Sequence, residues 1–177
     1  MQFNVSQLLK SSVGATREYD ISEQASVLED VEVVSPFDGH VKLTRTPQGI
    51  LVKATLVTTL ALSCSRCLEP MTYSLEIGFE EEFDPTVDVL TGIELPAPDD
   101  SNIFTLDENH ILDLTPAVRE YAVLALPMQP LCRIDCAGLC HRCGHDLNSG
   151  KCGCAAGTVD SRLLVLQSLL EEKPDEG

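Results

Sequence analysis

Eight cysteines are the residues of this chain whose type and spacing could do chemistry. Six of them lie between residues 131 and 154, and the last four have the spacing C-x2-C-x8-C-x-C: Cys140, Cys143, Cys152 and Cys154. A structural zinc ion takes four soft ligands, usually supplied as two close pairs. Gly144 follows the first pair, where the backbone must come close to the sulfurs. The spacing therefore predicts a zinc knuckle with these four thiolates as its ligands.

The other four cysteines form two half-sites. Cys132 and Cys136 stand just before the knuckle in a C-x3-C spacing, and Cys64 and Cys67 stand far upstream in a C-x2-C spacing. Because closed structural sites have four donors, the simplest expectation is that the two pairs meet around a second zinc ion. Such a site would tie the upstream segment to the C-terminal region. The sequence thus predicts two zinc ions as cofactors.

Two other uses of the cysteines stay open. Disulfides would suit a secreted domain, but the N-terminal residues show no basic segment followed by an apolar one, so no signal peptide is expected. The Cys64/Cys67 pair could serve a thiol redox sensor or oxidoreductase, although a redox C-x-x-C usually accompanies a βαβ pattern. His141 and His145 could replace a thiol of the knuckle, but with four cysteines present we expect both to be exposed and without a role.

The chain is strongly acidic. Its 177 residues include 28 acidic and 12 basic side chains, a formal charge of −16, and two four-thiolate zinc sites would bring this to about −20. Phosphate binding depends on lysine and arginine, so we do not expect this chain to coat nucleic acid. We expect it to bind a basic protein partner. If RNA is contacted directly, Arg133, Arg142 and Lys151 around the knuckle are the expected contacts. No apolar run reaches the length of about 20 residues that spans a bilayer, so no membrane partner is expected.

Alternation of apolar and polar residues predicts three strands, over residues 31–43, 50–63 and 72–83, with a break near 35–39. Joined by tight turns, these strands would form an antiparallel meander with one wet face and with the Cys64/Cys67 pair at a hairpin tip. The expected fold class is α+β. It comprises an antiparallel meander or partly closed barrel, a packed helix, a C-terminal zinc knuckle and a terminal helix.

Residues 84–112 lose this alternation and contain many acidic residues and prolines, so we expect a solvated loop or an acidic docking surface for a basic partner. Between Cys67 and Arg119 the chain has 13 acidic residues and no lysine or arginine.

Two helices are predicted. The first covers residues 115–126, with Thr115 as its N-cap and Pro116 at its first position, and the second covers 161–171, after Asp160. The chain is thus divided into a β domain, residues 1–126, and a cysteine-rich zinc-binding region with a C-terminal helix, residues 127–177.

The sequence lacks the motifs of common enzyme classes. It has no G-x-x-x-x-G-K-[ST] phosphate loop, no G-x-G-x-x-G dinucleotide motif and no G-x-S-x-G nucleophile elbow. A catalytic zinc ion keeps one position open, whereas eight cysteines can fill two closed sites. We therefore expect a protein that is not an enzyme.

Several runs of residues together resemble the YceD family, bacterial and plastid proteins linked to the accumulation of large-subunit ribosomal RNA. These runs are Leu62 to Pro70 around the first cysteine pair, Asp113-Leu-Thr with Arg119-Glu120, Leu126-Pro127 with Pro130-Leu-Cys132, and Cys136-Ala-Gly-Leu-Cys140 with Cys143-Gly144 and Leu147-Asn148. The resemblance covers roughly residues 31–154, and Asp160 to Leu163 also fit. It implies a cytoplasmic role in ribosome assembly, with a ribosomal protein or another assembly factor as partner. It supplies no catalytic residue and no oligomeric state.

Overall fold

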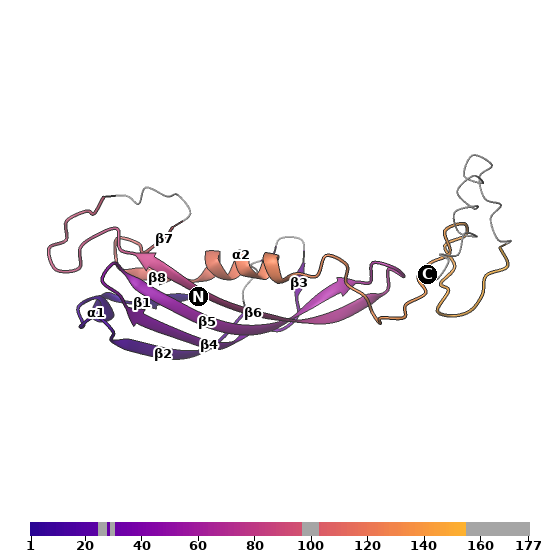
Figure 1. Cartoon of the computed structure of the whole chain (residues 1–177), viewed down its shortest axis with the longest axis horizontal. Coiled ribbons are helices and arrows are strands. Elements are labelled where there is room, and N and C mark those ends of the chain that lie inside the picture. The colour runs from indigo at the N-terminus through magenta and orange to yellow at the C-terminus, as the bar shows by residue number, and fades with distance from the viewer. Residues whose placement is uncertain (25–27, 29–30, 97–102, 155–177) are drawn as a thin grey trace, which may run out of the picture.

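The computed structural model describes residues 1–24, 28, 31–96 and 103–154. Its centre is a curved sheet that runs along most of the molecule's length (Figure 1). The sheet has the order β2-β4-β5-β6-β7 with β3 beside β5, and every pair is antiparallel except β6 and β7. Its strands are β2 (Thr16–Glu23), β3 (Glu32–Val33), β4 (Phe37–Arg45), β5 (Ile50–Ser63), β6 (Pro70–Asp84) and β7 (Phe104–Thr105). A separate two-stranded sheet joins β1 (Gln2–Asn4) to β8 (Ile111–Asp113).

The hairpin of β5 and β6 extends the sheet at one end. The two strands pair without interruption as far as Ser63 and Pro70, whereas β4 pairs with β5 only as far as Val57. Apolar side chains of both strands are buried on one face and polar side chains lie on the other, as the alternation predicts. The hairpin therefore carries its turn beyond the end of the other strands (Figure 1).

The helix α2 (Thr115–Ala125) lies along the apolar face of the sheet (Figure 1). Its side chains Ala117, Val118 and Ala122 are buried in the core. The ring of Tyr121 stacks on the ring of Phe79 from β6, with centroids 4.8 Å apart and planes inclined by 14°. A short helix, α1 (Ser6–Leu9), adds two buried leucines to the same core. The predicted packing of a helix on the sheet is confirmed.

The start of α2 differs in detail from the prediction. Thr115 is the first residue of the helix and not its N-cap, which is Leu114, so Pro116 takes the second position. Leu114 has no side chain that can cap the helix, and the carboxylate of Asp113 accepts the N–H of Thr115 at 2.9 Å. The side chain of Asp113, two residues before Thr115, thus accepts an N–H of the first turn in place of a side chain at the N-cap.

The sheet is open and not closed into a barrel. Closure would require its edge strands to pair, but in the described ranges β2 pairs only with β4 and β7 only with β6. The helices and the β1/β8 pair cover the apolar face instead, so the core is buried without closure. The parallel β6/β7 pair departs from a simple meander. The segment 84–112 is also not a loop throughout, because it contains β7 and the first two residues of β8.

Two predictions about the C-terminal part of the chain are not tested by this structure. The terminal helix predicted for residues 161–171 lies outside the described residues. The division into two regions at residue 126 stays a prediction. Within the described ranges, neither helix is long and apolar enough to cross a membrane.

Candidate metal centres

The first group of thiols lies at the tip of the β5/β6 hairpin. Cys64 and Cys67 follow β5 directly, and the chain that leaves α2 brings Cys132 and Cys136 to the same place. All four Sγ atoms lie within 4.8 Å of one another, with 3.8 Å from Cys64 to Cys136 and 3.7 Å from Cys67 to Cys132. A tetrahedral ion with metal–sulfur bonds of about 2.3 Å holds its sulfurs about 3.8 Å apart. The geometry of this group therefore fits one four-coordinate metal ion.

The second group comprises Cys140, Cys143, Cys152 and Cys154, whose Sγ atoms also lie within 4.8 Å of one another. Cys143 is exposed, whereas three of the four cysteines in the first group are buried, so the second group lies closer to solvent. The two groups account for every cysteine of the chain. Their arrangement is consistent with two metal ions. Ligation by these particular thiolates stays a prediction.

The Cys64/Cys67 pair is held in a tight backbone turn. The N–H of Leu68 donates to the carbonyl of Cys64 at 2.9 Å, and the N–H of Cys64 donates to the carbonyl of Glu69 at 2.9 Å. Backbone N–H groups, first that of Cys132 and then that of Cys67, lower the pKa of Cys64 to about 6. Because the thiolate is the form that binds metal, these N–H groups prepare Cys64 as a ligand.

The Cys140/Cys143 pair is held in an equivalent turn. The N–H of Gly144 donates to the carbonyl of Cys140 at 2.8 Å, and the N–H of Cys140 donates to the carbonyl of His145 at 2.8 Å. Backbone N–H groups of Arg142 and Cys143 lower the pKa of Cys140 to about 6. Both pairs thus have the same backbone turn and a first cysteine whose pKa is lowered by backbone N–H groups, which suits the same kind of ligation.

Each group contains a thiol whose pKa is raised to about 12. Cys132 is exposed as a residue, but its sulfur lies among three other thiols, and loss of solvent followed by hydrogen bonds with Cys67 and Cys64 raises its pKa to about 12. A hydrogen bond with the Cys143 thiol, followed by burial, raises the pKa of Cys154 to about 12. Four thiolates at this spacing repel one another, so their full ionisation requires a cation among them.

Asn148 connects the second group to the first. Its Nδ2 donates to the sulfur of Cys136 at 3.4 Å, and this hydrogen bond is the main cause of the lowered pKa of Cys136. Its Oδ1 accepts the N–H of Ala137 at 2.8 Å and a guanidinium N–H of Arg133 at 2.7 Å. The carboxylate of Asp146 accepts the second hydrogen bond of Nδ2 at 2.7 Å, which fixes the orientation of the amide. Partners of this kind orient metal ligands. The spacing of the cysteines does not reveal that Asn148 has this role.

Backbone contacts also tie the hairpin tip to the later segment. A guanidinium N–H of Arg66 donates to the carbonyl of Cys136 at 2.9 Å, and the carbonyl of Arg66 accepts the N–H of Leu139 at 3.1 Å. Gly138 lies between these two contacts with φ of 73°, and a Cβ at this position would come within 3.0 Å of the Arg66 carbonyl oxygen. Glycine is thus required here for both conformation and space.

The three basic residues proposed as phosphate contacts have different surroundings. Arg133 is bonded to the side chain of Asn148, so its guanidinium supports the fold around the first group. Arg142 and Lys151 are exposed beside the second group, as are His141 and His145. The exposed histidines agree with expectation. RNA binding by the basic residues stays a prediction.

Comparison with family models matches residues 52–170 to the family described as large ribosomal RNA subunit accumulation protein YceD. An uncharacterised protein of Mycobacterium tuberculosis is 27% identical over 145 residues, which cover 78% of this chain and 64% of that protein. The chain thus spans less than two thirds of the mycobacterial relative.

Two further relatives extend the comparison. The Arabidopsis thaliana protein named large ribosomal RNA subunit accumulation protein YCED homolog 1, chloroplastic, is 25% identical over 159 residues, covering 78% of this chain and 50% of the relative. Protein YlbN of Bacillus subtilis is 25% identical over 171 residues and covers 96% of this chain and 95% of its own length. No solved structure matches the chain. Since the family model covers more than half of the chain and includes every cysteine, the chain belongs to the YceD family.

Proposed function

We propose that this chain is a non-enzymatic cytoplasmic factor that supports the accumulation of large-subunit ribosomal RNA during ribosome assembly. Two zinc ions stabilise its cysteine-rich end, and it acts by holding a basic partner, a ribosomal protein or another assembly factor. The observation that carries the proposal is that all eight thiols gather in two four-sulfur groups. A zinc ion with four protein ligands has no position left for water or substrate.

The charge of the chain supports a protein partner over direct RNA binding. The formal charge is −16, and 13 acidic residues lie between Cys67 and Arg119 without a lysine or arginine. All three basic residues near the second group are exposed, but the guanidinium of Arg133 already bonds the side chains of Asn148 and Asp135, so Arg142 and Lys151 are the cations there that we consider for phosphate contacts. Two cations release few counterions from RNA, so they support little affinity by themselves.

Metal analysis tests the structural role of the thiols. We expect the purified chain to contain about two zinc ions, with thiols that resist alkylation until a chelator is added. The rival function, a thiol redox sensor or oxidoreductase using Cys64 and Cys67, requires a metal-free protein with one readily oxidised thiol. The full burial of Cys64, 3.8 Å from Cys136, counts against this rival.

A complementation experiment tests the cellular role. In cells that lack their own member of this family, we expect the chain to restore the ratio of large-subunit to small-subunit ribosomal RNA, and a Cys64→Ser, Cys140→Ser variant to fail. Tight binding of purified ribosomal RNA with a steep salt dependence, without any protein partner, would overturn the protein route. Arg142→Glu and Lys151→Glu would then be expected to weaken that binding.

A further inference from the structure

Strand β6 has a long edge with which no strand pairs in the described residues. Its residues 70–83 pair with β5 on one side, whereas on the other side β7 pairs only with Phe83 and Asp84. In the part of the chain that the structure describes, no other strand pairs with residues 70–82. Alternate residues of an edge strand direct their N–H and C=O groups outward, where they can pair with an added strand.

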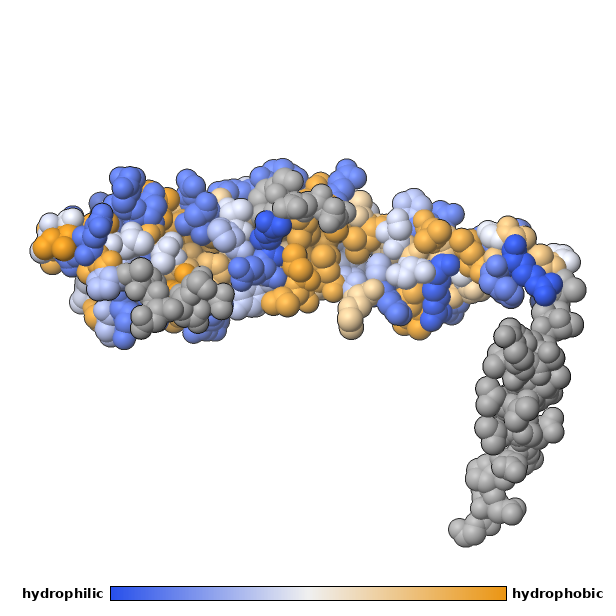
Figure 2. All heavy atoms as spheres, turned by 90° about the horizontal axis from the view of Figure 1, so that it is seen from above, coloured by the Kyte–Doolittle hydropathy of each residue, from blue (hydrophilic) through white to orange (hydrophobic). Residues whose placement is uncertain are grey.

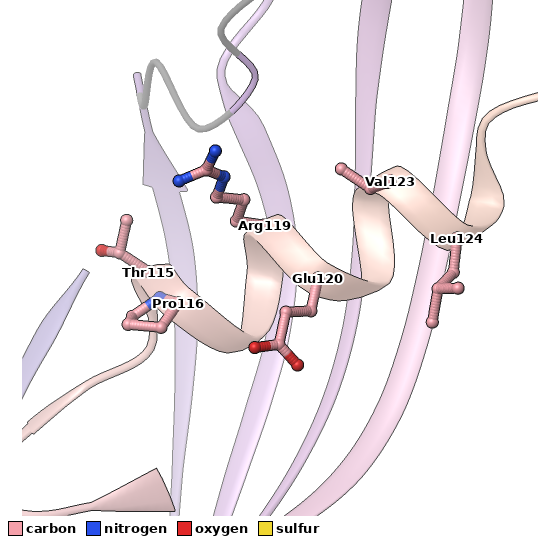
Figure 3. Close-up of a pocket in the computed structure, with 6 residues that line it drawn as sticks. All are labelled: Thr115, Pro116, Arg119, Glu120, Val123 and Leu124. Atoms are coloured by element: carbon pink, nitrogen blue, oxygen red, sulfur yellow. The ribbon is translucent and has the colours of Figure 1, made fainter. Parts of the chain in front are cut away.

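A groove runs between β6 and α2. It encloses about 390 Å³ and is lined by Glu76, Ile77 and Gly78 of β6 and by Tyr121, Leu124 and Ala125 of α2. Leu124 also lines a second hollow, along the outer face of α2, which includes Pro116 and Val123 (Figure 3). The side chains of Val123 and Leu124 are apolar, and the two residues are 53% and 77% exposed. Seen from this side, apolar residues gather near the middle of the molecule's length (Figure 2). The wall beside the edge is therefore largely apolar.

The opposite face of β6 is acidic. Glu76, Glu80 and Glu82 share one parity of the strand and lie on the face away from the buried core. Glu80 forms an exposed ion pair with Lys53 at 3.5 Å, while the cross-strand neighbour of Glu76 is the uncharged Val57. A strand laid along this edge would thus meet carboxylates on one face and apolar side chains on the other.

We propose that the edge of β6 and the groove beside α2 bind an extended segment of the basic partner as an additional strand. Lysine or arginine alternates with apolar residues in this segment. The inference depends on the proposed function for the basic character of the partner. Backbone hydrogen bonds to β6 provide affinity, apolar side chains enter the groove beside Leu124, and basic side chains reach Glu76 and Glu80. A second copy of the chain fits this edge poorly, because two rows of glutamates would face each other.

The test uses the full, metal-loaded chain and a labelled peptide in which lysine and valine alternate over about ten residues. Fluorescence polarisation is expected to show binding that weakens with salt, and hydrogen exchange is expected to slow at backbone amides of residues 71–82. Leu124→Lys and Glu76→Lys should each weaken binding at least about tenfold. Leu90→Lys and Glu108→Lys make the same changes at exposed positions outside the groove and should bind like the parent chain.

Methylated peptides separate strand addition from simple charge attraction. N-methyl groups on one set of alternate amides should abolish binding, and those on the other set should leave it intact, because only one set faces β6. Equal binding by both peptides, unchanged exchange in β6, or full affinity of the Leu124→Lys variant would overturn the proposal. A dimer in sedimentation experiments that the Leu124→Lys substitution dissociates would also overturn it. If the basic peptide binds elsewhere, the proposed function survives without this inference; if the chain binds RNA alone and no basic peptide, the proposed protein partner fails as well.

Discussion

Leu68 occupies a backbone position that the equivalent turn gives to a glycine. Its φ is 63°, close to the 72° of Gly144. A side chain in this left-handed conformation costs about 1–2 kcal/mol. Leu68 is 64% exposed, so little packing offsets this cost. The two turns have equivalent backbone hydrogen bonds, so the turn that holds the cysteine pair, and not the preference of leucine, decides the conformation at this residue.

Substitution of glycines in the second centre measures the free-energy cost of a side chain at a positive φ in such a turn. Gly144→Ala is expected to lower the free energy of unfolding of the second centre by about 1 kcal/mol, because φ is positive there. Gly153→Ala is the matched control, since it has no positive φ, and at both positions an added Cβ would meet no atom within 4 Å. Thermal unfolding of the zinc-loaded variants provides the measurement. Equal effects of the two substitutions would show that strain in the turn is unimportant.

Asn148 gives a second prediction at this scale. Asn148→Ala removes the hydrogen bond to the sulfur of Cys136 and is expected to weaken zinc binding at the first centre about 10–100-fold. Ser149→Ala is the neighbouring control, because its exposed hydroxyl bonds only the carbonyl of Asp146. Competition with a coloured chelator measures both variants. If the Asn148→Ala variant retained zinc as well as the parent chain does, Asn148 would not contribute to the zinc affinity of the first centre.

Single residues also show how far the sequence could predict the site. The cysteine spacing was enough to group the thiols, because close pairs and a count of four donors leave few combinations. The role of Asn148 depends on a contact with Cys136, 12 residues earlier, that no local pattern records. Phosphate binding by Arg133 stays a prediction, and its bond to Asn148 is a structural role that depends on the same fold and that no local pattern records.

At the scale of elements, local alternation predicts the long strands but does not predict β7 and β8. On β5 and β6 one face is buried over most of the length and the other is largely exposed, which gives a clear period of two. β7 and β8 have two and three residues, too few to show a period, so their acidic surroundings suggested a loop. Barrel closure depends on which edges meet, and this is decided by distant contacts such as the packing of α2 on β6.

The close pairing of β4 with β5 leads to a prediction about two strand glycines. A Cβ on Gly39 would lie 2.1 Å from the carbonyl oxygen of Thr55, so Gly39→Ala is expected to destabilise the sheet by about 1–3 kcal/mol. A Cβ on Gly78 would meet only the Ala54 carbonyl oxygen, at 3.9 Å, and Gly78→Ala should be neutral or stabilise by about 0.5–1 kcal/mol. Urea unfolding compares the two. Equal stability would contradict the close approach of the strands at Gly39.

At the scale of the whole molecule, the residues that the structure describes form two separate cores. One is the apolar core between the sheet and its helices, and the other surrounds Cys64, Cys67 and Cys136 at the end of the hairpin. The first holds most of the buried apolar side chains, so it supplies most of the hydrophobic stabilisation. The second is small, and metal binding would supply much of its stability.

Removal of metal should therefore unfold one end of the molecule and spare the other. With a strong chelator, we expect fast hydrogen exchange across residues 131–154 and continued protection in β4 and β5, with little change in the circular dichroism of the sheet. A Cys64→Ala, Cys140→Ala variant without chelator should show the same pattern. Loss of protection throughout the chain in a single transition would show that the two cores depend on each other.

On the proposed function, this separation has a consequence for a cell that is short of zinc. The chain would not be degraded as a fully unfolded protein, because its larger part would stay folded and keep the β6 edge. It would remain in a partly folded, metal-free state, and its cysteine-rich end would refold when zinc became available again. The supply of a nutrient could then adjust ribosome production without any new synthesis of this protein.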